Sequence, residues 1–226
     1  MSSFLERIQH ACTLNNAGAS LLAANDPSKA VKALKNALVV MEGLSKEESS
    51  EDFVMSDATA AKYDHCLSLK VPSLEDTFFI FNRAILLDAA SIDIDLAFSN
   101  AAILFNLALT FHMGGKARCQ APKLQRAVHL YGLSIKLLDA MPVCGASSAL
   151  ALAALNNQAQ IQSDLFQFEA SQECLEQVRE LLQYIPMPEP ATAQDSTFLP
   201  LVTGEDMDEI YLNVAISAFP MTAPSA

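Results

Sequence analysis

Amide side chains are the residues in this sequence whose types and spacing suggest a chemical role. Asparagines occur as two adjacent pairs, Asn15-Asn16 and Asn156-Asn157, and another follows a phenylalanine on a predicted helix, as Phe105-Asn106. An asparagine side chain both donates and accepts hydrogen bonds, so it can pair with the N–H and C=O groups of an extended peptide. These residues point to recognition of a protein segment rather than to catalysis.

Groups suited to catalysis or metal binding lack the neighbours that such chemistry requires. The sequence has no GxSxG motif, and no cysteine lies in a local nucleophile signature. Gly114-Gly115-Lys116 lacks the spacing and the Ser/Thr of a phosphate-binding loop. His112 and His129 fall on neighbouring predicted helices, but two imidazoles without a third ligand make a poor metal site. We therefore expect a protein that is not an enzyme, with no catalytic residue, no metal and no cofactor.

The negative charge of the chain argues against some classes of binding partner. Its 226 residues carry a formal net charge of −12, and 51 % of them are apolar. Nucleic acids and anionic membrane surfaces carry phosphates that such a chain would repel. We expect a protein or peptide partner, no nucleic acid and no membrane, and the oligomeric state stays open.

The cysteines and the N-terminal residues indicate in which cellular compartment the protein is expected. The five cysteines are scattered and odd in number, which indicates free thiols in a reducing environment. The first residues show no basic start followed by an apolar run, so they do not resemble a signal peptide. The most apolar stretch, 101–113, is too short to span a bilayer. The expected location is cytoplasmic or nuclear, and the protein is not expected to be secreted.

Most of the chain has the composition of α-helices, with capping and helix-breaking residues between them. Alanine and leucine dominate, and glycine is scarce at seven residues. Two helices are expected in 3–44, divided at Asp26-Pro27 because aspartate is a good N-cap and proline is favoured at the first helical position. Two more are expected in 99–140, with a loop after Gly114-Gly115, and another two in 146–185.

The remaining segments are an insertion at 45–98 and a tail at 186–226. The insertion opens with an acidic, serine-rich loop at 45–52, and 58–69 has the pattern of a short helix. Residues 77–98 contain β-branched residues and alternation, as in Ile92 to Leu96, which predicts a small β-hairpin. The tail begins with three closely spaced prolines and contains a strand candidate at 209–217.

Three stretches of the chain repeat the same order of residue types. A leucine, an asparagine and a small residue are spaced two apart in each: Leu14, Asn16 and Gly18; Leu104, Asn106 and Ala108; Leu155, Asn157 and Ala159. A second small residue follows twelve positions after the first, at Ala30 and Ser171, and at Ala127 once a seven-residue insertion is removed. Small side chains at these positions let two helices of one unit pack closely.

This pattern resembles the tetratricopeptide repeat family, whose unit is a helix-turn-helix pair of about 34 residues. The resemblance implies a mostly α fold in a single TPR-like domain, 1–226. Its stacked helix pairs would form a right-handed α-solenoid, with the β-hairpin inserted between units one and two. The units would be about 3–44, 99–140 and 146–185.

In this family the first helices of the units line a concave groove that binds a peptide or a segment of a partner. The resemblance therefore implies a non-enzymatic protein-protein interaction domain, an adaptor or scaffold. The residues that it places in the groove are Asn15, Asn16, Phe105, Asn106, Leu109, His112, Asn156, Asn157 and Gln160. The Lys and Arg side chains with which some members grip the C-terminal carboxylate of chaperones are missing, so carboxylate-clamp binding of chaperone tails is not expected.

Two alternatives remain beside the adaptor. In the first, the chain fills its own groove with residues 78–87 or with 210–216, as in a structural subunit or a self-associating protein. In the second, an all-helical pocket near Phe105, His112 and Tyr131 binds a small ligand or acts as an enzyme.

Overall fold

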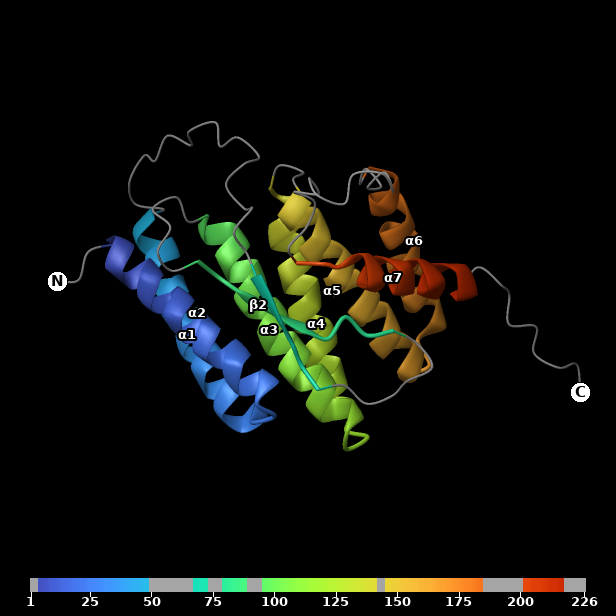
Figure 1. Cartoon of the computed structure of the whole chain (residues 1–226), viewed down its shortest axis with the longest axis horizontal. Helices are drawn as coiled ribbons and strands as arrows, with labels where there is room; N and C mark the ends of the chain where they lie inside the picture. The colour runs from blue at the N-terminus through green and yellow to red at the C-terminus, as the bar shows by residue number, and fades with distance from the viewer. Residues whose placement is uncertain are drawn as a thin grey trace, which may run out of the picture.

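The computed structural model describes residues 4–48, 67–72, 79–88, 95–141, 145–184 and 201–217. These residues form helices and a two-stranded antiparallel sheet, so the protein is mostly helical with a small β-hairpin, as predicted (Figure 1). The elements are α1 (Phe4–Ala23), α2 (Pro27–Glu48), β1 (Leu67–Lys70), β2 (Arg83–Leu86), α3 (Leu96–Lys116), α4 (Ala121–Asp139), α5 (Gly145–Asp164), α6 (Phe168–Tyr184) and α7 (Gly204–Ser217).

The first six helices form three pairs that stand side by side in chain order (Figure 1). Within the pairs α1 packs on α2, α3 on α4, and α5 on α6; between them α2 packs on α3 and α4 on α5. The insertion between α2 and α3 therefore does not separate the first pair from the second. Leu34, Ile103 and Leu152, one from each pair, are fully buried in one continuous core.

One short turn geometry joins the two helices of every pair. Asn25, Cys119 and Phe166 each have a left-handed backbone, with φ of 60°, 50° and 60°. In each turn this residue donates its N–H to the carbonyl three positions earlier, and the following N–H reaches five positions back, as from Gln167 to Gln162 at 2.8 Å. This is the Schellman arrangement that satisfies the last carbonyls of a helix. Three turns with one hydrogen-bond pattern support the internal repeat.

The helix boundary predicted at Asp26-Pro27 is confirmed. Asp26 accepts a hydrogen bond from the N–H of Lys29 at 3.2 Å, and Pro27 is the first residue of α2. The acidic loop predicted from Ser45 is wrong over its first four residues, because α2 continues to Glu48. Lysine and glutamate are strong helix formers, so the sequence SKEE extends a helix that is already formed.

The helix end predicted at Gly114-Gly115 is wrong, because α3 continues through both glycines to Lys116, and the predicted loop is limited to 117–120. In the first and third pairs, the left-handed residue of the turn follows the first small residue of the repeat by seven positions. In the second pair the distance from Ala108 to Cys119 is eleven positions. The additional residues therefore lengthen both helices by about one turn. Gly115 does not stop the helix: a Cβ there would lie 2.8 Å from Leu124, so the glycine permits close approach of α3 and α4.

The hairpin lies partly where it was predicted but with a different partner strand. β2 falls within 77–98, yet it pairs with β1, in the register Leu67 opposite Leu86 and Lys70 opposite Arg83. The short helix predicted at 58–69 is therefore wrong over 67–69, and 58–66 lie outside the described residues. The strand predicted at 92–96 is wrong at its end, because Asp95 caps α3 by accepting the N–H of Phe98 at 2.9 Å; 92–94 are likewise not described.

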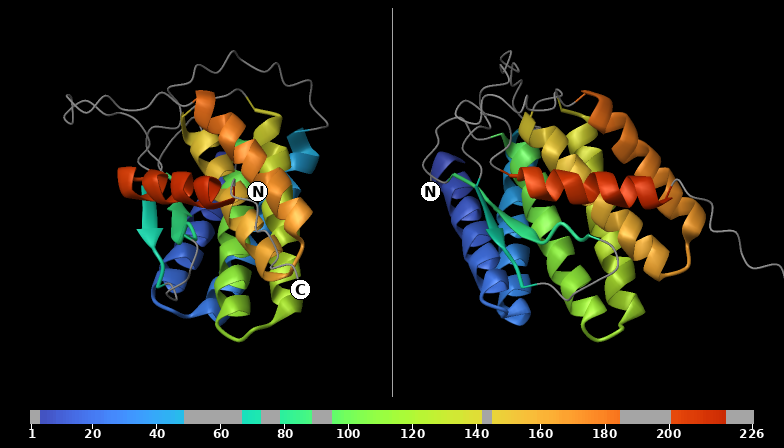
Figure 2. Two further views of the ribbon diagram at one scale, coloured as in Figure 1. Left: turned by 90° about the vertical axis from the view of Figure 1, so that its right-hand side faces the viewer. Right: turned by 45° about the vertical axis from the view of Figure 1, so that its right-hand side comes forward.

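The strand predicted at 209–217 is also wrong, because this segment belongs to α7. Its buried residues Asp206, Ile210 and Asn213 are spaced by four and three, which is the period of a helix face. Seen end-on, α7 and the hairpin lie on the same side of the helix pairs (Figure 2, left). That side is where the candidate site lies.

Within the described part of the chain, α3 alone has the length and composition to cross a membrane. The mean hydropathy of its most apolar window is 1.4, and 72 % of that window is buried inside the protein. The helix is longer than the run 101–113 read from the sequence, and its burial is that of a core helix.

Alanine at the two adjacent glycines of α3 should change stability in opposite directions. Gly115→Ala places a methyl group 2.8 Å from Leu124 Cδ2 and 3.2 Å from its backbone nitrogen, and should lower the free energy of unfolding by about 1–3 kcal/mol. Gly114→Ala meets only the end of Lys123 at 4.0 Å, and should raise it by up to about 1 kcal/mol through helix propensity. Chemical denaturation of both variants beside the wild type measures the difference, and equal shifts would contradict the close α3–α4 contact.

Candidate functional site

Six asparagines, here called the asparagine row, lie along one side of the helix pairs. They face an extended stretch, residues 79–87, here called the inner segment, which includes β2 and crosses the first helices of the pairs (Figure 1). The row consists of Asn15 and Asn16 on α1, Asn106 on α3, Asn156 and Asn157 on α5, and Asn213 on α7.

Four members of the row each bind both backbone polar groups of one residue. The N–H of Leu87 donates to Asn16 Oδ1 at 2.8 Å, and Asn16 Nδ2 donates to the carbonyl of Leu87 at 2.7 Å. An asparagine amide has an oxygen that accepts and an NH2 group that donates, so a single side chain can bond to both the N–H and the C=O of one residue. The same pair of bonds joins Asn106 to Ile85 (2.7 and 2.8 Å), Asn157 to Phe81 (2.8 and 2.9 Å) and Asn213 to Phe79 (3.2 and 2.8 Å).

The two edges of the inner segment have different partners. The backbone groups of Phe79, Phe81, Ile85 and Leu87 bond to the asparagine row. The carbonyl of Asn82 points to the other edge and accepts the N–H of Val71 at 2.7 Å, at the end of the β1–β2 ladder. Successive peptide groups of a strand point to opposite edges, which explains the alternation. The asparagine row therefore stands where a third strand would otherwise pair.

Three members of the row occupy the same position of the sequence repeat. Asn16, Asn106 and Asn157 each precede the first small residue of a unit by two, and each makes the two-bond contact with the backbone. The repeat thus places one backbone-binding amide on the first helix of each pair. These contacts join residues 21 to 76 positions apart.

The other asparagines connect neighbouring members of the row. Asn15 donates to the carbonyl of Ile85 at 2.9 Å and accepts from Asn106 Nδ2 at 2.8 Å. Asn156 donates to the carbonyl of Phe79 at 3.1 Å and accepts from Asn213 Nδ2 at 2.7 Å. Bonds between asparagines on different helices fix the spacing of those helices as well as the inner segment.

Phe105 takes the place that Asn15 and Asn156 hold in the other two pairs. Its ring packs on Phe81, with centroids 5.9 Å apart, and on Tyr131, at 5.4 Å. The Tyr131 hydroxyl accepts a hydrogen bond from Asn157 Nδ2 at 3.1 Å, which ties this aromatic cluster to the row.

The titratable groups behind the row are buried and neutral. Burial lowers the pKa of His112 to about 3, and its ring meets the edge of Tyr131 with centroids 6.1 Å apart. Burial raises the pKa of Tyr131, with the Asn157 bond opposing the shift. Burial also raises the pKa of the Cys12 thiol to about 11, so the reactive thiolate is not populated near neutral pH.

Not all of the predicted site residues contribute to the row. Leu109 and His112 are fully buried in the helical core. Gln160 Nε2 donates to Asp164 Oδ1 at 3.2 Å, one turn further along its own helix. Asn213 was missed, because α7 had been read as a strand. Only the helical period of its buried residues could have indicated that Asn213 faces inward.

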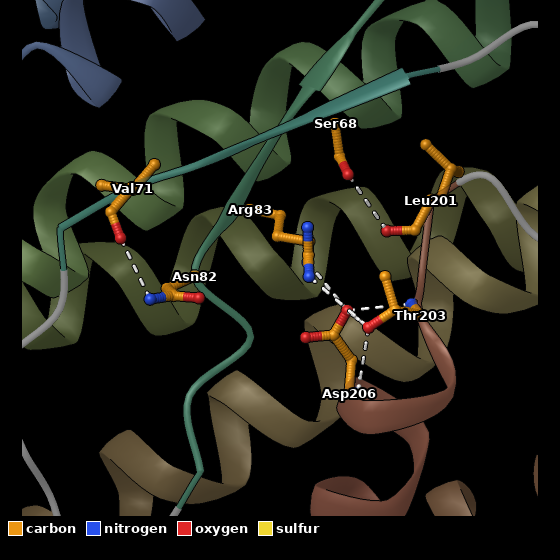
Figure 3. A network of polar contacts seen from close by, with 7 residues as sticks. All are labelled: Ser68, Val71, Asn82, Arg83, Leu201, Thr203 and Asp206. Atoms are coloured by element: carbon orange, nitrogen blue, oxygen red, sulfur yellow. Dashed lines mark hydrogen bonds and ion pairs between the residues drawn. The ribbon is translucent and has the colours of Figure 1, made fainter.

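Polar contacts hold α7 and the hairpin together beside the row (Figure 3). Arg83 Nε lies 2.7 Å from Asp206 Oδ2, and both side chains are mostly buried. Asp206 also accepts the N–H and the hydroxyl of Thr203 at 2.9 and 2.7 Å, which caps the start of α7. Ser68 of β1 donates to the carbonyl of Leu201 at 3.4 Å. α7 is thereby fixed to both strands of the hairpin.

Comparison of the chain with protein-family models, with curated proteins and with solved structures finds no match. Among the residues that the structure describes, no group of three or more His, Cys, Asp or Glu side chains is placed to hold a metal ion. The functional proposal therefore depends on the geometry of the asparagine row.

Removing one amide from the centre of the row should destabilise the protein. Asn106→Leu leaves the buried N–H of Ile85 without its acceptor and removes two donated bonds, so we expect a loss of about 2–4 kcal/mol in the free energy of unfolding. The matched control, Asn36→Leu on the exposed face of α2, should change it by less than about 0.5 kcal/mol. Urea denaturation of both variants is the measurement, and a loss below 1 kcal/mol for Asn106→Leu would contradict the bonding described here.

Proposed function

We propose that the protein is a non-enzymatic protein-interaction scaffold of the tetratricopeptide-like kind, in which the inner segment takes the place of a peptide ligand. Three helix pairs with one turn geometry, packed in chain order, support the repeat architecture. The recurrence of one backbone-binding asparagine on each first helix supports a face that recognises extended chain.

The observation that carries the proposal is the pairing of four residues of the inner segment with asparagines at both the N–H and the C=O. Main-chain bonds along an extended peptide are a general mode of peptide recognition. Here the peptide belongs to the same chain, so the groove expected from the resemblance holds its own ligand. In this proposal a partner binds to surfaces other than the asparagine row.

The inner segment is held too firmly for a free peptide to replace it readily. Phe81, Ile85 and Leu87 are buried, and burial of each such side chain contributes roughly 1.5–3 kcal/mol. A tethered segment also competes at an effective concentration of about 1 mM. The arrangement favours a permanently filled inner face over an adaptor that takes peptides there.

The enzymatic alternative has less support. Phe105, His112 and Tyr131, around which a ligand pocket was considered, are fully buried. The inner segment covers Phe105 directly through Phe81. A substrate could reach these side chains only after the segment had left.

A labelled peptide tests whether the row is filled. Fluorescein-labelled peptide 77–90 should show no saturable binding to the intact chain up to about 100 µM, because the tethered segment outcompetes it. A Phe81→Ser/Ile85→Ser variant, whose own segment fits poorly, should bind the same peptide and gain thermal stability from it. A scrambled peptide is the control, and fluorescence anisotropy is the readout. Binding of peptide 77–90 to the wild type below about 10 µM would show an open row and contradict the proposal.

A further inference from the structure

The turn between α5 and α6 exposes two aromatic side chains at the end of the third pair. Phe166 is 80 % exposed and Phe168 is 51 % exposed. Their rings meet edge to face, with centroids 6.1 Å apart and an angle of 83° between the planes. We call this pair the aromatic knuckle. Aromatic side chains, phenylalanine among them, are enriched in the cores of protein interfaces.

Folding does not explain the aromatic residue at position 166. Phe166 has φ of 60°, a backbone conformation that a bulky side chain rarely adopts and that asparagine tolerates well. The equivalent turn of the first pair has Asn25 at the same φ. The chain thus keeps an exposed phenylalanine where asparagine would fit the turn better, which points to a role in binding.

A stripe of negative charge starts beside the knuckle and runs along α6. Glu169, Glu173, Glu176 and Glu180 are exposed, and their spacing of four, three and four places them on one face of the helix. The stripe is about 16 Å long. Asp164, at the end of α5, is bonded to Lys116 at 3.0 Å and so is already partnered. Arg179 is the one basic residue of α6, so the four glutamates leave this helix with a net negative charge that favours a positively charged partner.

We propose that the aromatic knuckle and the acidic stripe together form a docking surface for a basic amphipathic helix of another protein. Apolar side chains of that helix cover Phe166 and Phe168, and its Lys or Arg residues, repeated at the same four-three-four spacing, face the glutamates of α6. The inference rests on the proposed function, because a filled inner face leaves partner binding to the outer surface.

The probe for this surface is a synthetic 18-residue helical peptide of Lys and Leu, with leucine on one face, measured by fluorescence anisotropy with the full chain. Phe166→Asn/Phe168→Gln should weaken its binding by about tenfold, as expected for an aromatic anchor. The same variant should unfold at an equal or higher Tm, because asparagine fits the left-handed turn. The matched control is Val39→Asn on α2, where an equally exposed apolar residue is lost, and it should leave the affinity unchanged. Unchanged affinity in the phenylalanine variant would overturn the proposal.

A second pair of variants separates the stripe from the general acidity of the chain. Glu173→Gln/Glu176→Gln should weaken the binding of the peptide by about threefold to tenfold, because two charge contacts are lost. The affinity should also depend less on salt concentration between about 50 and 300 mM. Glu205→Gln/Asp208→Asn, on the exposed side of α7, should have little effect. Equal losses from α6 and α7 would reduce the binding to non-specific attraction and overturn the proposal.

Two further measurements distinguish docking of a protein helix from binding to a lipid surface and from peptide binding at the asparagine row. Retention on phosphatidylcholine vesicles that is lost in the phenylalanine variant would assign the knuckle to a lipid surface and overturn the docking of a protein helix. Binding of peptide 77–90 to the wild type would overturn the filled inner face alone, since the knuckle variants do not touch the asparagine row.

Discussion

A buried backbone must form hydrogen bonds, and the inner segment meets this requirement with asparagine side chains. One edge of the segment pairs with β1, and the other edge lies against helices, which have no free backbone groups to offer along their sides. Amides from α1, α3, α5 and α7 fill that role, each carrying the donor and the acceptor that a neighbouring strand would provide. The same bonds hold the helix pairs and α7 in a fixed order around the segment.

This constraint also shapes what the protein can bind. The row recognises main chain rather than particular side chains, so its specificity comes from the apolar neighbours, such as Phe105 against Phe81. The inner segment bonds to all six asparagines, so this face is part of the core. In the function that we propose, other proteins bind to the outer surface, where the strained Phe166 and the glutamates of α6 offer a chemically distinct face.

Local patterns in the sequence were sufficient to predict the six helices of the three pairs and the repeated asparagines. Asn16, Asn106 and Asn157 stand out because their spacing to leucine and to small residues recurs, and that spacing reflects contacts within one helix pair. Residues 78–87 were one of two segments considered as a filling of the groove, but the sequence could not pair single residues, because Asn157 and Phe81, for example, lie 76 positions apart. A short apolar run such as 210–216 fits a strand as well as a helix, so the strand prediction for α7 was wrong and Asn213 was missed. Gly115 was read as a helix stop, whereas tertiary packing against Leu124 explains it.

Amide hydrogen exchange of the intact chain tests the central interaction most directly. The N–H groups of Phe81, Ile85 and Leu87 donate to Asn157, Asn106 and Asn16, so they should exchange as slowly as the core amides of α3. Residue-resolved NMR can compare the two sets in one sample. Exchange of the three amides at the rate of an unprotected chain, while α3 stays protected, would show that the asparagine row does not hold the inner segment.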